Sequence, residues 1–223
     1  MIRKTACVLA LASTMLAGSA AAQANSWQHK WYWGAQGGIM TFKTVDASGF
    51  ETGWQNAYTV GGHWLITGTR SAFYAAFDQV IFKDTTNSAI VDASSPTGIR
   101  SVLWNKGRRI QAMLLVFPTD GYIQPYLGGG FGIHQLVNAF PAGTFGTTQQ
   151  QEVALQTIDQ VSTKAFPILA AGLQMRFTKL ALFGQAQYMP MGRNYLITSA
   201  QYVASVGFRY AVTGSREDVT GRR

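Results

Sequence analysis

Two residues of opposite charge are spaced so that they could pair inside a β-structure. Asp78 and Arg109 lie on successive segments of alternating side chains, each on the face opposite the large apolar residues. Each residue lies a similar number of positions from the end of its segment that is joined by a short turn. Because an unpaired charge away from water is costly, we expect them to form an ion pair. Arg176 and Arg209 lie closer to the turns and are expected to reach water.

The residue types that support catalysis or metal binding are scattered. The alternation of side chains places His63 and His134 on the inward face. Neither is followed two residues on by a serine, so the sequence does not indicate a histidine–serine site for acyl transfer. Three histidines and one cysteine provide no metal-ligand spacing. Glycines 128–130 and 132 precede no helical pattern, which a dinucleotide-binding loop requires. We therefore expect no enzymatic activity, no metal and no cofactor.

These residues lie on eight segments in which apolar side chains alternate with small or polar ones. The approximate bounds of the segments are 31–42, 54–67, 71–82, 109–117, 122–134, 166–177, 180–189 and 201–210. The connections between them run long, short, long, short, long, short and moderate. An antiparallel up-and-down barrel with tight turns at one rim and longer loops at the other produces this order. The sequence therefore predicts an all-β, eight-stranded barrel.

Two of the connections are much longer than the rest. Residues 83–100 are rich in Asp, Ser, Thr and Asn and are expected to form a loop. The longest connection, 135–163, contains Ala154, Ile158 and Val161 at helical spacing, although the same residues could extend a strand. Both connections belong to the rim opposite the tight turns.

The fourth and fifth segments form a hairpin whose faces differ in chemistry. Pro118 to Gly121 supplies the turn, because proline presets φ and glycine accepts the left-handed region. In the second strand Leu127, Phe131 and Ile133 share one face, and glycines alternate with them on the other. A glycine face would be a poorly soluble surface, whereas an apolar face suits lipid. We expect a transmembrane barrel, with a soluble lipocalin-like binder of a hydrophobic small molecule as the alternative.

Aromatic residues gather near the ends of the segments. They are Trp31, Trp33, Trp54, Trp64, Trp104, Phe117, Tyr122, Phe177, Tyr188, Phe208 and Tyr210. Amphipathic rings favour the interface between lipid and water, although aromatic residues also favour strands in general. Their collective placement supports the transmembrane interpretation.

The N-terminus has the three parts of a secretory signal peptide. Arg3 and Lys4 precede the apolar run 6–16, and small residues end at Ala24. Cleavage of residues 1–24 would leave a barrel at 25–211 and a polar tail at 212–223. The only cysteine, Cys7, lies in the signal peptide, so no disulfide is expected.

The expected mature chain remains basic. Loss of Arg3 and Lys4 lowers the number of Lys and Arg from 18 to 16, and the formal net charge from +8 to +6. An exported chain without a basic helix or zinc spacing is not expected to bind nucleic acid. Anionic lipid head groups are the more suitable counter-charge.

Two stretches resemble one known family. The run 125–132 (PYLGGGFG) resembles the glycine-rich fifth strand of small outer-membrane β-barrel proteins, the group with OmpA-type transmembrane domains and opacity-type surface proteins. The run 206–210 (VGFRY) is similar to the aromatic-ended last strand of that family. The resemblance implies an outer-membrane location and passage through periplasmic chaperones to the barrel-assembly machinery, with Phe208 and Tyr210 as the assembly signal. The polar tail departs from the family pattern and is too short for a peptidoglycan-binding domain.

An outer-membrane barrel would meet lipopolysaccharide on its outer side. Lys106 and Arg108 share the parity of Trp104 and Ile110, and with Arg100 they are candidates for binding lipopolysaccharide phosphates. Solvated loop charge is the alternative. We expect a structural or surface-interaction role; a narrow-pore channel or a lipid A-modifying enzyme remains open. The oligomeric state and the ligand of the loops do not follow from the sequence.

Overall fold

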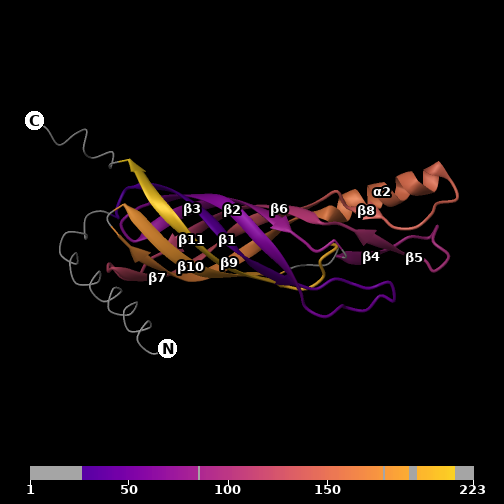
Figure 1. The fold of residues 1–223 in the computed structure, drawn as a ribbon, viewed down its shortest axis with the longest axis horizontal. Coiled ribbons are helices and arrows are strands. Elements are labelled where there is room, and N and C mark those ends of the chain that lie inside the picture. Colours follow the sequence, from indigo (N-terminus) through magenta and orange to yellow (C-terminus); the bar gives the residue numbers. More distant parts are fainter. Residues whose placement is uncertain (1–26, 85, 178, 191–194, 214–223) are drawn as a thin grey trace, which may run out of the picture.

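Eight long antiparallel strands close into a barrel (Figure 1). The computed structural model describes residues 27–84, 86–177, 179–190 and 195–213. The strands are β1 (Trp31–Phe42), β2 (Gln55–Thr67), β3 (Ser71–Ile81), β6 (Lys106–Val116), β7 (Ile123–Val137), β9 (Thr163–Arg176), β10 (Leu180–Met189) and β11 (Gln201–Thr213). Each pairs with its neighbours in the chain, and β1 pairs with β11 to close the ring. The predicted eight-stranded up-and-down barrel is confirmed.

The two ends of the barrel differ in the length of their connections. The connections β2–β3, β6–β7 and β9–β10 are short and lie at the end where the described chain begins and finishes (Figure 1). We call this the turn end. The longer connections extend from the opposite end, the loop end, and lengthen the molecule along the barrel axis (Figure 1).

The loop end carries folded structure of its own. The strands β4 (Asn87–Val91), β5 (Ile99–Leu103) and β8 (Phe140–Pro141) form a small sheet in the order β4-β5-β8. Because β8 pairs with β5, the sheet joins the β3–β6 connection to the β7–β9 connection. With α2 it makes a unit that we call the extension. The expectation of a plain loop at 83–100 was wrong, because Asn87–Val91 pairs with Ile99–Leu103 as a hairpin.

The longest connection contains the helix α2 (Thr148–Ser162). Thr147 caps its first turn by accepting a hydrogen bond from the Gln150 amide. Ala154 and Ile158 are buried, and Val161 packs against the buried cluster. Of the two structures left open for this run, the helix is therefore the one that forms, since its apolar residues recur on one face.

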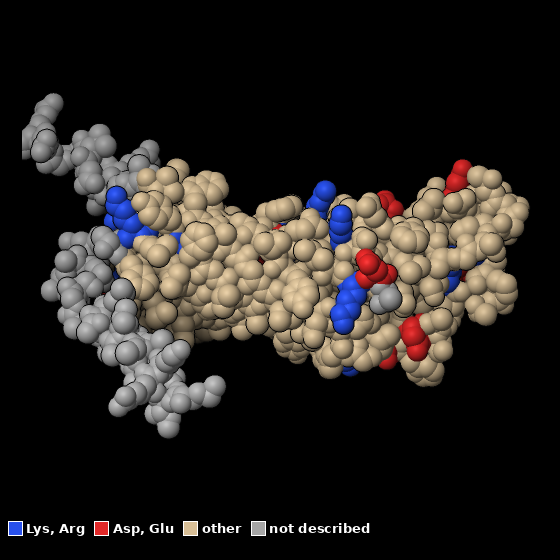
Figure 2. All heavy atoms as spheres, in the orientation of Figure 1, with Lys and Arg blue, Asp and Glu red and all other residues tan. Residues whose placement is uncertain are grey.

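The outer wall of the barrel is apolar. Outward residues such as Leu127 and Phe131 are 64% and 72% exposed, and β6 alternates strictly between exposed and buried residues. Within the eight described barrel strands, the charged residues at outward positions are Lys106 and Arg108. On the face shown in Figure 2, a broad band across the barrel has hardly any charged surface. A lipocalin-like barrel would have its apolar face inside, so that alternative does not fit the structure.

Aromatic rings cluster on the outer wall at both ends. Trp64 contacts Trp31 and Trp33 at the turn end, with ring centroids 5.5 and 5.9 Å apart. At the loop end Tyr202 contacts both Trp54 and Tyr188. Two such belts are expected where a barrel crosses the two interfaces of a membrane.

Trp104 and Phe117 are not members of these belts, because both are buried. Phe117 packs on Trp27, and Trp104 packs on Phe82, so each belongs to an apolar layer inside one end of the barrel. Between the two layers lies a polar middle section. No helix among the described residues is long and apolar enough to cross a membrane.

Candidate functional site

Asp78 and Arg109 form an ion pair in the middle of the barrel. They lie opposite each other on β3 and β6, and Arg109 Nη2 and Nε lie 2.7 and 3.2 Å from Asp78 Oδ2. Each side chain is 1% exposed. Gln36 and Gln111 also donate to the Asp78 carboxylate, at 2.6 and 2.9 Å. The carboxylate thus accepts from three side chains, which compensates for its removal from water.

Glycines on the inner wall make room for this network. A Cβ atom at Gly61 would overlap the Asp78 carboxylate, and one at Gly172 would lie within 2.5 Å of the Tyr126 hydroxyl oxygen. A Cβ atom at Gly34 would meet the His63 ring at 2.5 Å. The glycines predicted from the sequence to line the inner wall therefore leave space, and large polar side chains of other strands fill it.

A second cation, Arg209, lies deeper than the sequence suggested. It is 0% exposed, whereas water contact was expected, so that expectation was wrong. Its Nε donates to His63 Nε2 at 3.2 Å, and its Nη1 donates to Gln174 Oε1 at 2.8 Å. The guanidinium carbon also lies 4.0 Å from the centroid of the Phe183 ring. Arg176 is buried as well, and donates from Nε and Nη2 to the Gly121 carbonyl.

Both histidines lie inside the barrel and have structural partners. His63 accepts from Arg209, and His134 lies 3.3 Å from the Gln201 amide nitrogen. Neither forms a hydrogen bond with a serine or a carboxylate in the described part of the chain. The same residues contain no group of three or more His, Cys, Asp or Glu side chains placed to hold a metal ion.

The three basic residues proposed for the rim separate into two environments. Lys106 and Arg108 are exposed at the loop end of β6. Arg100 is instead buried, forms an ion pair with Asp92, and donates to the Ala142 carbonyl at 3.0 Å. Its inclusion with the other two must be corrected, because Arg100 is used to tie the β4–β5 hairpin to the segment before α2.

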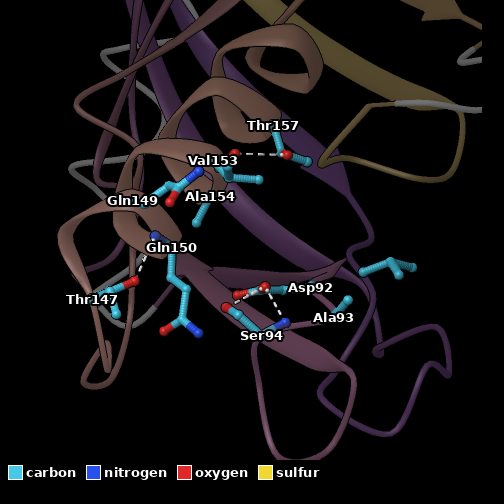
Figure 3. A pocket seen from close by; sticks show the side chains of 10 residues that line it. Asp92, Ala93, Ser94, Thr147, Gln149, Gln150, Val153, Ala154 and Thr157 are labelled. Atoms are coloured by element: carbon cyan, nitrogen blue, oxygen red, sulfur yellow. Dashed lines mark hydrogen bonds between the residues drawn. The ribbon is translucent and has the colours of Figure 1, made fainter.

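Sequence reasoning missed Asp92 and the surface around it. An open cavity of about 430 Å³ lies between the first half of α2 and the β4–β5 turn (Figure 3). Asp92, Ser94, Gln150, Val153 and Thr157 are among the residues that line it. Ser94 and Arg100 donate hydrogen bonds that hold the pKa of Asp92 below its ordinary value. A loop hairpin of five-residue strands leaves too short a pattern to reveal such a site.

Phe208 and Tyr210 lie on the outer wall of β11 toward the turn end, 48% and 49% exposed. The strand continues to Thr213, two residues beyond the expected end of the barrel. The predicted signal peptide, and the rest of the expected tail from residue 214 on, lie outside the described residues.

The closed barrel, its apolar outer band and its paired aromatic belts define the class of the protein. It is a small transmembrane β-barrel of the outer membrane. In this class the short turns are periplasmic and the longer loops extracellular, so the turn end is periplasmic and the loop end extracellular.

Comparison with one solved structure, the first of the two below, agrees with that fold. Neisserial surface protein A is 13% identical, with a TM-score of 0.53, over 82% of this chain and 97% of that chain. The outer membrane protein OprG from Pseudomonas aeruginosa is 12% identical over 85% of this chain and 99% of that chain, with a TM-score of 0.46. No family model and no curated protein sequence matches the chain.

Proposed function

We propose that the barrel is an outer-membrane anchor that presents the extension for interactions at the cell surface. The observation that carries this proposal is the contrast between the two parts. The barrel interior is filled by buried side chains, among them Arg109, Tyr74 and Tyr126, each 1% exposed or less. The extension, by contrast, has a sheet, a helix and an open cavity outside the membrane. No enzymatic step is part of this proposal.

The rim of the barrel supplies a second contact, with lipopolysaccharide. Lys106 and Arg108 lie on the same outer face of β6 as Ile110, so two cations lie directly above an apolar surface. An amphiphile with phosphate groups above acyl chains matches that order of charge and apolar contact. Neither cation has an ion-pair partner among the described residues, which leaves both available to an anion.

Surface labelling tests the anchor and its orientation. Because Cys7 is the only cysteine, single cysteines introduced into the mature chain report on their own sites. We expect Gln151→Cys on α2 to react with a membrane-impermeant maleimide on intact cells, and Asp120→Cys in the β6–β7 turn to react only after lysis. Labelling of Asp120→Cys on intact cells, or recovery of the protein in the soluble periplasmic fraction, would refute the proposal.

Purified lipopolysaccharide tests the rim contact. The variant with Lys106→Glu and Arg108→Glu should bind less lipopolysaccharide in phospholipid nanodiscs, and the difference should shrink as salt rises. Lys179→Glu is the matched control, because Lys179 is exposed at the turn end. Equal binding by both variants and the unchanged protein would contradict a role for Lys106 and Arg108, without affecting the anchor proposal.

A further inference from the structure

The hydrogen-bonding capacity of Arg209 is only partly used by the protein. Its Nε and Nη1 have acceptors in His63 and Gln174, but Nη2 is buried and has no protein acceptor among the described residues. Faces of Phe183, Tyr74 and Tyr126 lie 4.0, 5.8 and 5.6 Å from the guanidinium carbon. Aromatic faces attract a cation but are weak hydrogen-bond acceptors. The Tyr126 side chain also interacts with Arg209, but Nη2 still lacks a hydrogen-bond partner.

The charges buried in the barrel do not balance. Asp78 is already paired with Arg109, and no described carboxylate forms an ion pair with Arg209 or Arg176. His63 adds no negative charge, since its Nε2 accepts from Arg209 and the ring is therefore neutral with its proton on Nδ1. A guanidinium removed from water without a counter-charge is strongly destabilising. Asp120 in the β6–β7 turn acts on Arg176 only from a distance, so neither guanidinium group has a carboxylate in contact with it.

Arg176 and Arg209 lie on the two strands that flank β10, each on the inward face. Both lie opposite Ala181 in the β9–β10 and β10–β11 ladders, so two strand spacings, about 10 Å, separate their Cα atoms. The inward residue between them is an alanine, whose methyl group leaves room for their long side chains. Arg176 Nη1 and Trp27 Nε1 are further buried donors without a protein acceptor. Trp27 lies beside Arg176, with 5.5 Å between its ring and the guanidinium carbon.

We propose that the barrel binds one small monovalent anion, of the size of chloride, between Arg209 and Arg176 above Ala181. Such an anion accepts hydrogen bonds in several directions, and so suits buried donors that lack an acceptor. It also supplies the missing negative charge. The tight packing of Phe183 and Tyr126 around Arg209 favours a halide over a larger oxyanion.

Thermal unfolding in an uncharged detergent tests the site. At equal ionic strength, replacing gluconate with chloride should raise the Tm in a saturable way, by about 3–6 °C at ten times the Kd. Arg209→Gln should abolish this response, and Lys179→Gln, which removes an exposed cation at the same end, should retain it. Equal Tm values in both salts, or an unchanged response in Arg209→Gln, would overturn the proposal.

A crystallographic measurement on the unchanged protein covers the case in which Arg209→Gln does not fold. Crystals grown in bromide should show an anomalous peak within hydrogen-bond distance of Arg209 Nη2. Water in place of bromide at that position would show that the donors are hydrated instead, and the anion site would be rejected.

Discussion

Gly61 on β2 lies directly opposite Asp78 on β3, and a Cβ atom at position 61 would overlap the Asp78 carboxylate. The carboxylate occupies that space while it accepts from Arg109, Gln36 and Gln111. The missing side chain on one strand is thus a condition for the buried charge on the next.

Gly61→Ala should destabilise the barrel, because either the β2–β3 ladder or the Asp78 network has to shift. A cost of about 1–3 kcal/mol is typical when a packed interior is overfilled. Gly62→Ala is the control, since its added Cβ faces outward and comes no closer than 3.6 Å to another heavy atom. Urea unfolding in lipid vesicles, followed by tryptophan fluorescence, measures both. Equal stabilities would show that the inner wall is not tightly packed at Gly61.

The Asp78–Arg109 pair should show strong coupling between its members. Asp78→Asn leaves the Arg109 charge buried without its partner. Arg109→Met likewise leaves the Asp78 charge buried without its partner. Each change should lower the free energy of unfolding by about 3–5 kcal/mol, and the double variant should lose less than the sum. The same unfolding assay measures this coupling. Additive losses would mean that the two charges act independently in spite of their 2.7 Å contact.

A charge introduced on the outer wall should distinguish lipid from water. Ala112 is exposed in the middle of β6, and Ala112→Arg should cost about 2–4 kcal/mol if that position lies near the centre of the bilayer. Val91→Arg is the comparison, because Val91 is 84% exposed in the extension, where water surrounds it. Reconstituted vesicles suit the measurement. Tolerance of arginine at both positions would argue against a lipid-facing wall.

The extension should loosen in acid through Asp92. Hydrogen bonds from Ser94 and Arg100 hold the pKa of Asp92 below its ordinary value of 3.8 in the folded protein. Its contribution to stability is therefore fully present above pH 3.8 and is lost as pH falls through the lowered pKa. Hydrogen exchange of the β4 and β5 amides, corrected for intrinsic rates, should accelerate in that window.

Two variants isolate the role of Asp92 in this loosening. Asp92→Asn should show faster exchange at neutral pH and little further acceleration in acid. Asp159→Asn, which changes an exposed carboxylate on α2, should behave like the unchanged protein. If Asp92→Asn kept the full acid response, another group would have to be responsible.

Phe208 and Tyr210 should affect assembly more than stability. Alanine at both positions removes the aromatic end proposed for recognition by the barrel-assembly machinery, and should slow insertion in vesicles that contain this machinery. Tyr202→Ala removes an outward aromatic residue of the same strand near the loop end and serves as the control. Spontaneous folding into detergent should be similar for both. Equal insertion rates for the two variants would show that Phe208 and Tyr210 are not needed for recognition by the assembly machinery.

The barrel could be predicted because its alternation continues over ten or more residues in every strand. A wrong register would turn Leu127 and Phe131 to the inside, so the sequence specifies the register strongly. The Asp78–Arg109 contact follows from the same counting, as both residues lie within continuous strands. Sequence reasoning could not reach Arg209, whose burial depends on rings contributed by three other strands.

Assigning inward and outward faces from the alternation of side chains failed where the chain leaves the barrel. Trp104 and Lys106 share a parity, yet Trp104 is buried and Lys106 is exposed, because β5 ends at Leu103 and β6 begins at Lys106. The break between two strands resets which face each residue takes. For the same reason Arg100 could not be recognised as the partner of Asp92, since that contact needs the β4–β5 hairpin.

The extension is assembled from two loops that the barrel brings together. The β5–β8 pairing and the bond from Arg100 to the Ala142 carbonyl both join segments about 40 residues apart, one on each side of the β6–β7 hairpin. Neither contact is available until that hairpin stands between β3 and β9. The extension can therefore form only after the β6–β7 hairpin has brought its two loops side by side, so its folding depends on the assembly of the central strands of the barrel.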